Sequence, residues 1–129
     1  YVTEEETQRA LNILNAFGKA EIMPENLFDI VTGVSGSGPA YVFMFIEAMA
    51  DAAVNGGMQR KQAYTFAAQT VLGAAKMVLE TGKHPGELKD EVCSPGGTTI
   101  QGVHTLEEAG FRAAVMNAVM AAYEKNFKL

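Results

Sequence analysis

One long apolar tract, from Pro39 to Val54, most constrains how this 129-residue chain can fold. The tract reads PAYVFMFIEAMADAAV, and only Glu47 and Asp51 interrupt it. A membrane span needs about 20 mostly uncharged apolar residues, so this tract is too short and too charged to cross a bilayer. Because the two acids are four residues apart, they share one helical face and leave nearly every other face apolar. The pattern predicts a central helix surrounded by protein, which a partner chain can share.

Start and stop signals divide the rest of the chain into further helices. Thr3 and Glu6 form a capping-box pattern, and Gly18, Gly82 and Gly110 mark helix ends. No segment alternates with a period of two, so we predict an all-α bundle in one domain, residues 1–129, in which numerous alanines let helix axes approach. The expected helices cover residues 4–17, 24–36, 38–55, 60–81, 84–92, 98–109 and 111–127. Six methionines at helical spacing are interpreted as core residues: Met44, Met49, Met58, Met77, Met116 and Met120.

Composition narrows the function classes. With 48% apolar residues the chain is expected to bury a sizeable core. Its net charge of -5 and thinly spread cations argue against binding to nucleic acid or to an anionic membrane. A single cysteine, Cys93, and no visible signal peptide favour a reducing, cytoplasmic setting, and we interpret Cys93 as a buried, inert thiol. One cysteine and two histidines without a spaced acidic cluster predict no metal site.

The glycine-rich segment IVTGVSGSGPAYVF is the first candidate binding site. It could be a strand followed by a phosphate-binding turn, but a dinucleotide fingerprint needs a small residue where Tyr41 stands and an acid about 20 residues further on. Neither is present. We therefore predict a tight glycine joint between two helices, where a flat ligand ring can approach the backbone closely.

The second candidate site is the run Ser-Pro-Gly-Gly-Thr-Thr, which precedes the predicted helix 98–109. Free N–H groups at a helix start, together with the helix dipole, form a site for a carboxylate or one phosphate face. No Walker lysine follows, which argues against a nucleoside triphosphate. The alternative is an ordinary turn capped by its own threonines. Cys93 with His84 or His104 lacks an orienting third group, and His104 is interpreted as a packed or solvated side chain.

Two segments together, TGVSGSGPAY and HPGELKDEVCSPGGTTIQGVHTLEEAGFR, resemble the C-terminal half of pyrroline-5-carboxylate reductases. That resemblance implies an all-α dimerisation domain, similar to the C-terminal domain of 6-phosphogluconate dehydrogenase. It also implies an N-terminal Rossmann domain, absent from this chain, that binds NADPH or NADH. The expected reaction is reduction of 1-pyrroline-5-carboxylate to L-proline by a homodimer, with a larger ring of dimers left open. The fragment alone is expected to be inactive.

The same resemblance implies roles for particular residues. Ser94 and the backbone of Gly97, Thr98 and Thr99 would bind the substrate carboxylate, and the Thr99 hydroxyl would contact the ring nitrogen as the catalytic group. Thr98 stands where the family often has alanine. The cofactor-binding segment would be Ser37, Gly38 and Pro39, near the nicotinamide ring.

Two other functions stay open at this stage. One is the helical domain of another two-domain reductase, of the hydroxyacid or ketopantoate type. Such enzymes usually need a catalytic lysine or a similar polar residue, and no lysine stands beside the glycine motifs in the sequence. The other is an oligomerisation module that binds no ligand.

Overall fold

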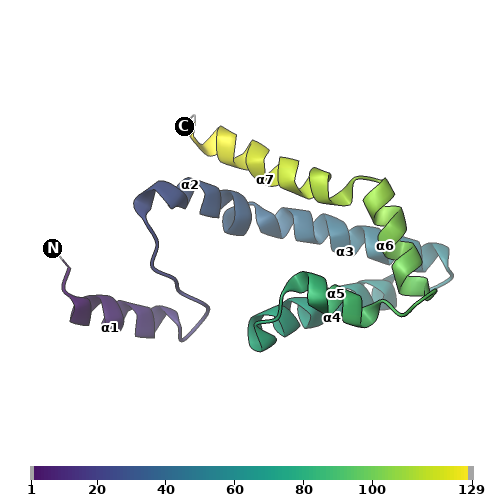
Figure 1. The fold of residues 1–129 in the computed structure, drawn as a ribbon, viewed down its shortest axis with the longest axis horizontal. Coiled ribbons are helices and arrows are strands. Elements are labelled where there is room, and N and C mark those ends of the chain that lie inside the picture. Colours follow the sequence, from purple (N-terminus) through teal and green to yellow (C-terminus); the bar gives the residue numbers. More distant parts are fainter. Residues whose placement is uncertain (1, 128–129) are drawn as a thin grey trace.

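The computed structural model describes residues 2–127, and this part of the chain contains helices and turns but no strand (Figure 1). In Figure 1, α1 lies apart from the other helices, whereas α7 runs along one side of α3 and α4 lies on the other. The prediction of an all-α fold is confirmed. The elements are α1 (Glu4–Leu14), η1 (Glu25–Leu27), α2 (Phe28–Val31), η2 (Thr32–Gly36), α3 (Gly38–Asn55), α4 (Arg60–Thr81), α5 (Pro85–Val92), α6 (Thr98–Glu108) and α7 (Phe111–Phe127).

Helix α1 begins at the predicted capping box and ends earlier than predicted. The Thr3 N–H donates to the Glu6 carboxylate at 2.8 Å, and the Glu6 N–H donates to the Thr3 hydroxyl at 3.3 Å. The helix stops at Leu14 rather than near residue 17. Asn15 follows it, and its side-chain oxygen accepts the Ala20 N–H at 3.0 Å. This bond joins residues on either side of the bend that follows the helix. The sequence prediction used Gly18 as the stop signal and therefore placed the end of the helix too late.

The glycine-rich segment is helical almost throughout. The chain passes from η1 through α2 into η2, a π-helical turn, and enters α3 after the single bend residue Ser37. Ser37 has φ -87° and ψ -29°, and neither Gly36 nor Gly38 has a positive φ. The segment is therefore neither a strand followed by a phosphate turn nor a sharp joint. A widened helical turn replaces the joint that we expected.

Helix α7 crosses η2 at a buried glycine. A Cβ atom on Gly33 would lie 3.1 Å from the Val119 carbonyl oxygen and 3.5 Å from the Tyr123 backbone nitrogen. At Ala118, the residue before Val119, the carbonyl oxygen accepts a hydrogen bond from the Tyr41 hydroxyl at 3.1 Å. Because Gly33 has no side chain, the backbones of η2 and α7 can approach closely. The hydrogen bond from Tyr41 then holds α7 against the start of α3.

The buried core lies between α3 and α4, and it is small. Ala50, Ala63 and Ala67 are its fully buried hydrophobic residues among those described. Alanines at the contact bring the two helix axes close together. The hairpin is further fixed by an ion pair between Arg60 and Asp51, and the Arg60 guanidinium lies 5.6 Å from the centre of the Tyr64 ring.

Most large apolar side chains of the single chain are exposed, contrary to the sequence prediction. Phe43 and Met44 on α3 are 67% and 69% exposed, so α3 is not surrounded by protein within one chain. The methionine prediction also fails, because Met49 is half-buried and the other described members are exposed. Composition gives the number of apolar side chains, but it does not show whether they are covered by residues of the same chain or of another chain.

Two glycines of α4 provide a matched test of backbone strain. Gly82 ends the helix in the left-handed conformation at φ 66°, whereas Gly73 lies inside the helix, and neither has an atom within 4 Å of an added Cβ. We expect Gly82→Ala to lower the free energy of unfolding by about 1 kcal/mol through strain alone. Gly73→Ala should raise it by roughly 0.5–1 kcal/mol through helix propensity. Urea denaturation followed by circular dichroism measures both, and equal effects of the two variants would contradict this account.

Candidate functional site

The segment between α5 and α6 is a tight turn built from the residues of the second motif. The Gly97 N–H donates to the Ser94 carbonyl oxygen at 3.0 Å. Pro95 and Gly96 occupy the two central positions, and Gly96 has φ 68°. Proline followed by a residue with positive φ is the signature of a type II turn. The turn places Ser94 beside Gly97, the N-cap residue of α6.

Gly97 has no room for a side chain because Ser94 occupies that space. A Cβ atom on Gly97 would lie 2.3 Å from the Ser94 hydroxyl oxygen and 3.1 Å from the Ser94 carbonyl oxygen. The backbone of Gly97, at φ -75° and ψ 171°, is one that any residue can adopt. The glycine is therefore required by the position of the Ser94 hydroxyl rather than by backbone strain.

The N-terminus of α6 carries backbone donors that no side chain caps. Gly97 is the N-cap residue, its own N–H is used in the turn, and the helix has no capping side-chain hydrogen bond. The N–H groups of Thr98, Thr99 and Ile100 lack intrahelical acceptors by their position in the first turn. Within the described residues, no threonine hydroxyl forms a capping hydrogen bond with this helix start. The donors and the Ser94 hydroxyl together suit a carboxylate.

Ser37, Gly38 and Pro39 lie far from that turn within the chain. They form the N-terminal end of α3, whereas α6 lies toward the C-terminal end of α3 in Figure 1. An 18-residue helix is about 27 Å long, so the two predicted segments do not meet in one chain. Gly38 has no atom within 4 Å of an added Cβ, so its backbone is open to approach.

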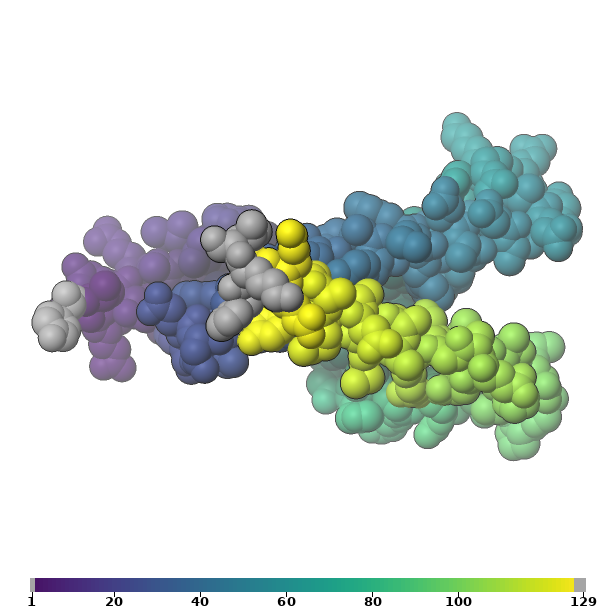
Figure 2. Space-filling model, turned by 90° about the horizontal axis from the view of Figure 1, so that it is seen from above, coloured from purple at the N-terminus to yellow at the C-terminus, as the bar shows by residue number. Residues whose placement is uncertain are grey.

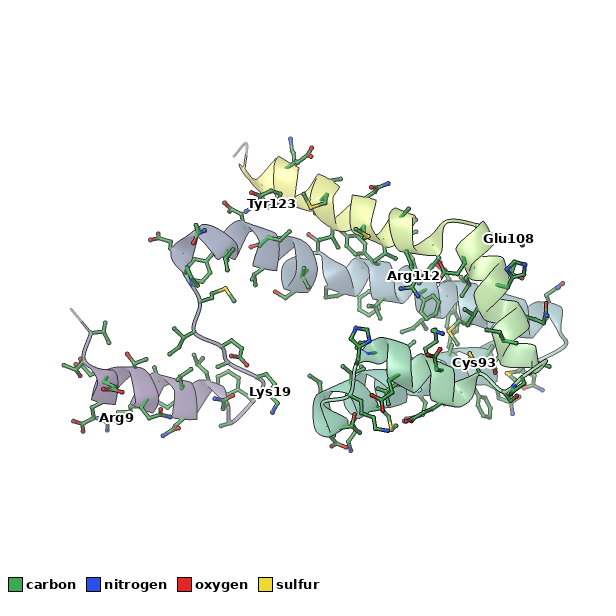
Figure 3. The ribbon with its side chains drawn as sticks, in the orientation of Figure 1. Arg9, Lys19, Cys93, Glu108, Arg112 and Tyr123 are labelled. Atoms are coloured by element: carbon green, nitrogen blue, oxygen red, sulfur yellow. The ribbon has the colours of Figure 1, made fainter. Side chains whose placement is uncertain are left out.

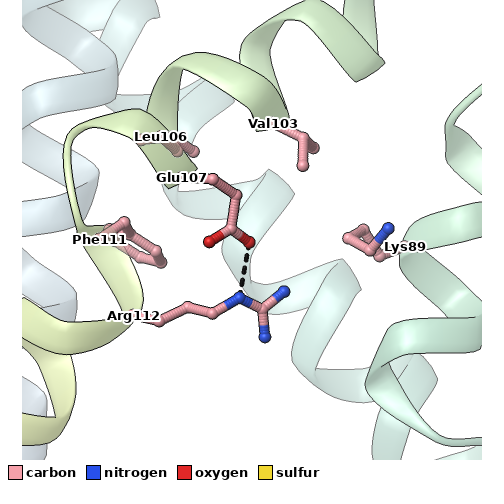
Figure 4. Close-up of a pocket in the computed structure, with 6 residues that line it drawn as sticks. All are labelled: Lys89, Val103, Leu106, Glu107, Phe111 and Arg112. Atoms are coloured by element: carbon pink, nitrogen blue, oxygen red, sulfur yellow. Dashed lines mark hydrogen bonds and ion pairs between the residues drawn. The ribbon is translucent and has the colours of Figure 1, made fainter.

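A pocket of about 300 Å³ lies behind α6, between α5 and the start of α7 (Figure 4). The Arg112 guanidinium donates to the Glu107 carboxylate at 2.6 Å, and this bond raises the pKa of Arg112. Lys89 also lines the pocket, and its hydrogen bond with Asp90 raises the pKa of Lys89. Lys89 shares this pocket with Val103 and Leu106, in the later turns of α6, and the pocket does not include the Ser94–Thr99 turn.

The remaining candidate residues have simple environments. Cys93 follows α5 and is half-buried rather than fully buried (Figure 3). His104 is exposed beside Glu108 at 3.5 Å, as expected for a solvated side chain. Within residues 2–127, no three His, Cys, Asp or Glu side chains gather closely enough to hold a metal ion. In the same part of the chain, no helix combines the length and hydrophobicity of a membrane span.

Comparison with known proteins identifies the family. Residues 25–129 match the family model described as pyrroline-5-carboxylate reductase dimerisation. The chain belongs to this family. The pyrroline-5-carboxylate reductase of Escherichia coli (strain K12) is 66% identical over 128 residues, which is 99% of this chain and 48% of the relative. That of Methanosarcina acetivorans is 65% identical over 98% of this chain and 47% of the relative. The chain thus spans about half the length of these relatives.

Solved structures support the same assignment. The pyrroline-5-carboxylate reductase of Coxiella burnetii matches with a TM-score of 0.92 at 36% identity, covering 98% of this chain and 47% of the other. The Plasmodium falciparum pyrroline carboxylate reductase, solved with NADP bound, matches with a TM-score of 0.85 at 39% identity, covering 97% and 50%. The resemblance to the pyrroline-5-carboxylate reductase family and the fold class inferred from it are therefore confirmed.

Proposed function

We propose that this chain is the dimerisation and substrate-binding part of an NAD(P)H-dependent reductase that converts 1-pyrroline-5-carboxylate to L-proline. The family assignment indicates the reaction, and the uncapped N-terminus of α6 is the observation that supports a binding role. The substrate is a five-membered cyclic imine with one carboxylate. Its charge suits the N–H groups of Thr98 and Thr99 and the Ser94 hydroxyl.

Thr99 is the proposed catalytic residue. The imine carbon accepts a hydride readily only when the ring nitrogen is protonated or strongly hydrogen-bonded. With the carboxylate bound at the helix start, the Thr99 hydroxyl would contact the ring nitrogen. A threonine hydroxyl is a weak acid, so its role is to position and polarise the ring, and the proton comes from the substrate iminium or from water.

The cofactor is proposed to be NADPH or NADH, bound mainly by an N-terminal domain. It supplies the hydride. Ser37, Gly38 and Pro39 are the proposed contacts from this chain, because the backbone around Gly38 is open to a flat ring. These residues lie at the opposite end of α3 from Thr99, so we assign them to the active site that contains the partner's turn in a homodimer. A cytoplasmic location stays a prediction.

Reductase activity tests this proposal in the full-length protein that carries the chain. We expect NADPH or NADH absorbance to fall when 1-pyrroline-5-carboxylate is added, and not when ketopantoate is added. Turnover of ketopantoate or a keto acid instead would favour the other two-domain reductases. A dimer with no turnover of any of these substrates would favour the oligomerisation module.

Gly97→Ala tests the placement of Ser94. The new methyl group would displace the Ser94 hydroxyl. The substrate carboxylate would then lose its hydrogen bond from this hydroxyl, which corresponds to roughly a tenfold rise in KM. The backbone dihedral angles of Gly97 suit alanine, and the 3.1 Å approach of the new carbon to the Ser94 carbonyl oxygen needs only a small shift of this exposed turn, so the fold should persist. We expect Ser94→Ala to raise KM similarly, and the double variant to add little to either change. Additive effects in the double variant, or an unchanged KM for Gly97→Ala, would contradict this role.

A further inference from the structure

Helix α5 leads directly into the proposed binding turn, and it is short. It spans eight residues, Pro85–Val92, none of them fully buried, and only Cys93 separates it from Ser94. The Cys93 N–H donates to the Asp90 carbonyl oxygen at 3.0 Å, so the last turn of the helix sets the direction in which the chain enters the binding turn. A helix of about two turns is marginal by itself, so its order depends on the groups at its ends.

His84 caps the first turn of α5. It is the N-cap residue, and its Nδ1 atom accepts the Gly86 N–H at 3.0 Å. A Cβ atom on Gly86 would lie 3.0 Å from Nδ1 and 3.3 Å from Cε1 of the same ring, so this glycine leaves room for the imidazole. Pro85 has no N–H, and the Gly86 N–H is therefore the first donor of the helix. The imidazole satisfies it.

Lys83, the residue before His84, stabilises the rest of α5. Its ammonium group pairs with Glu91, and it lies 3.4 Å from the Glu87 carboxylate. The hydrogen bond with Glu91, followed by that with Glu87, raises the pKa of Lys83. Glu91 stands three residues before Ser94. Lys83 and His84 together thus hold both ends of the helix that carries the binding turn.

The surroundings of His84 leave its ring without a carboxylate partner. Within residues 2–127, His84 forms no ion pair that would favour its protonated form, and both carboxylates that Lys83 contacts are engaged by that lysine. Other charged side chains of α5 and of the neighbouring ends of α4, α6 and α7 pair among themselves: Lys76 with Glu80, Lys89 with Asp90, His104 with Glu108 and Arg112 with Glu107. His84 is exposed, and in Figure 2 the teal-green residues around α5 project beyond the yellow α7 at one edge of the molecule. The ring can therefore exchange protons with solvent.

Only a neutral imidazole can form this cap. A protonated ring carries hydrogen on both nitrogens and has no acceptor, and its positive charge would lie at the positive end of the helix dipole. Histidine is the side chain that ordinarily gains its proton as the pH falls from about 8 to 5. The cap is therefore present at the upper end of this range and is lost toward the lower end.

We propose that His84 is a positioning residue for the substrate: its neutral form caps α5 and thereby orders the turn at Ser94, and its protonation loosens that turn. This inference rests on the carboxylate site of the proposed function and deepens it. It makes substrate affinity depend on pH through a residue that does not touch the substrate.

Kinetics of the full-length protein at pH 8 test the positioning role. We expect His84→Ala to raise KM for 1-pyrroline-5-carboxylate roughly fivefold, the effect of a lost N-cap, and to leave kcat within about twofold. His84→Asn should restore the wild-type KM, because asparagine is a good N-cap residue. A KM that asparagine does not restore, or a fall in kcat without a change in KM, would overturn the role.

Binding of L-proline between pH 5 and 8 tests the protonation step, because this ligand keeps its charges in that range. Titration calorimetry of the full-length protein should show the wild-type affinity falling roughly fivefold from pH 8 to pH 5, and that of His84→Asn staying level. His104→Asn is the matched control, since it replaces the exposed histidine of α6 and should keep the wild-type pH dependence. A level wild-type affinity, or an equally steep fall in His84→Asn, would contradict the inference.

NMR of the isotope-labelled 129-residue chain separates this inference from the proposed function. Long-range proton–nitrogen spectra should show that the His84 ring carries its proton on Nε2 at pH 8, with Nδ1 free to accept. A proton on Nδ1 would overturn the cap whatever the substrate is. A ring protonated on Nε2, in a protein that neither reduces 1-pyrroline-5-carboxylate nor binds L-proline, would confirm the cap but overturn the proposed function and the positioning role that rests on it.

Discussion

Thr99→Ala is expected to lower kcat of the full-length reductase by roughly tenfold or more, which corresponds to about 1.4 kcal/mol of barrier. The substitution removes the hydroxyl proposed to hold the ring nitrogen. It leaves the backbone N–H that binds the carboxylate, so KM should change much less than kcat. The measurement is the loss of reduced-nicotinamide absorbance at saturating 1-pyrroline-5-carboxylate.

Thr98→Ala is the matched control for this effect. Both threonines are exposed in the first turn of α6, and both backbones donate from the same helix start. Removing the Thr98 hydroxyl should leave kcat within about twofold, because only the backbone of this residue has a role. Equal losses in the two variants would mean that the hydroxyls support the turn generally, and an unchanged kcat for Thr99→Ala would remove its catalytic role.

Gly33→Val is expected to destabilise the fold by about 3 kcal/mol, at the upper end of the range for overpacking. The first added carbon already lies 3.1 Å from the Val119 carbonyl oxygen, and this neighbour is backbone, which cannot rotate away. Two further methyl groups would push α7 off η2. The same displacement would break the hydrogen bond from the Tyr41 hydroxyl to the Ala118 carbonyl oxygen.

The midpoint of urea unfolding measures this change. Gly73→Val is the control, because no atom lies within 4 Å of an added Cβ there and valine and glycine differ little in helix propensity. The α7 crossing is supported if Gly33→Val unfolds at clearly lower urea than Gly73→Val. Similar midpoints for the two variants would show that the crossing tolerates extra volume, contrary to the geometry.

Helix positions could be predicted from the sequence because their signals are local. Thr3 with Glu6 started α1, His84 and Pro85 started α5, and Gly82 ended α4, each as predicted. Burial could not be predicted, because it depends on contacts between distant residues. The bond from Asn126 to Asp29, at 2.6 Å, joins residues 97 apart in the sequence. Apolar periodicity gave the correct helices but assigned their exposed faces to a core that one chain does not contain.

Some features of the candidate site could likewise be predicted from neighbouring residues, and others could not. The proline and glycines of the turn predicted a helix start with free donors, since turn type and capping follow from neighbouring residues. The position of the Ser94 hydroxyl over Gly97 was not visible, because it depends on side-chain direction. The separation of Ser37 from Thr99 along α3 was also missed. Sequence motifs identified both segments but carried no information on which chain brings them together.

The central claim is that the N-terminus of α6 binds the carboxylate of the substrate ring. The most direct test is NMR of the isotope-labelled chain titrated with L-proline and, separately, with pyrrolidine, the same ring without the carboxylate. We predict that the backbone amides of Thr98, Thr99 and Ile100 respond to L-proline and not to pyrrolidine. Unchanged amides with L-proline, or the same response to both rings, would contradict the claim.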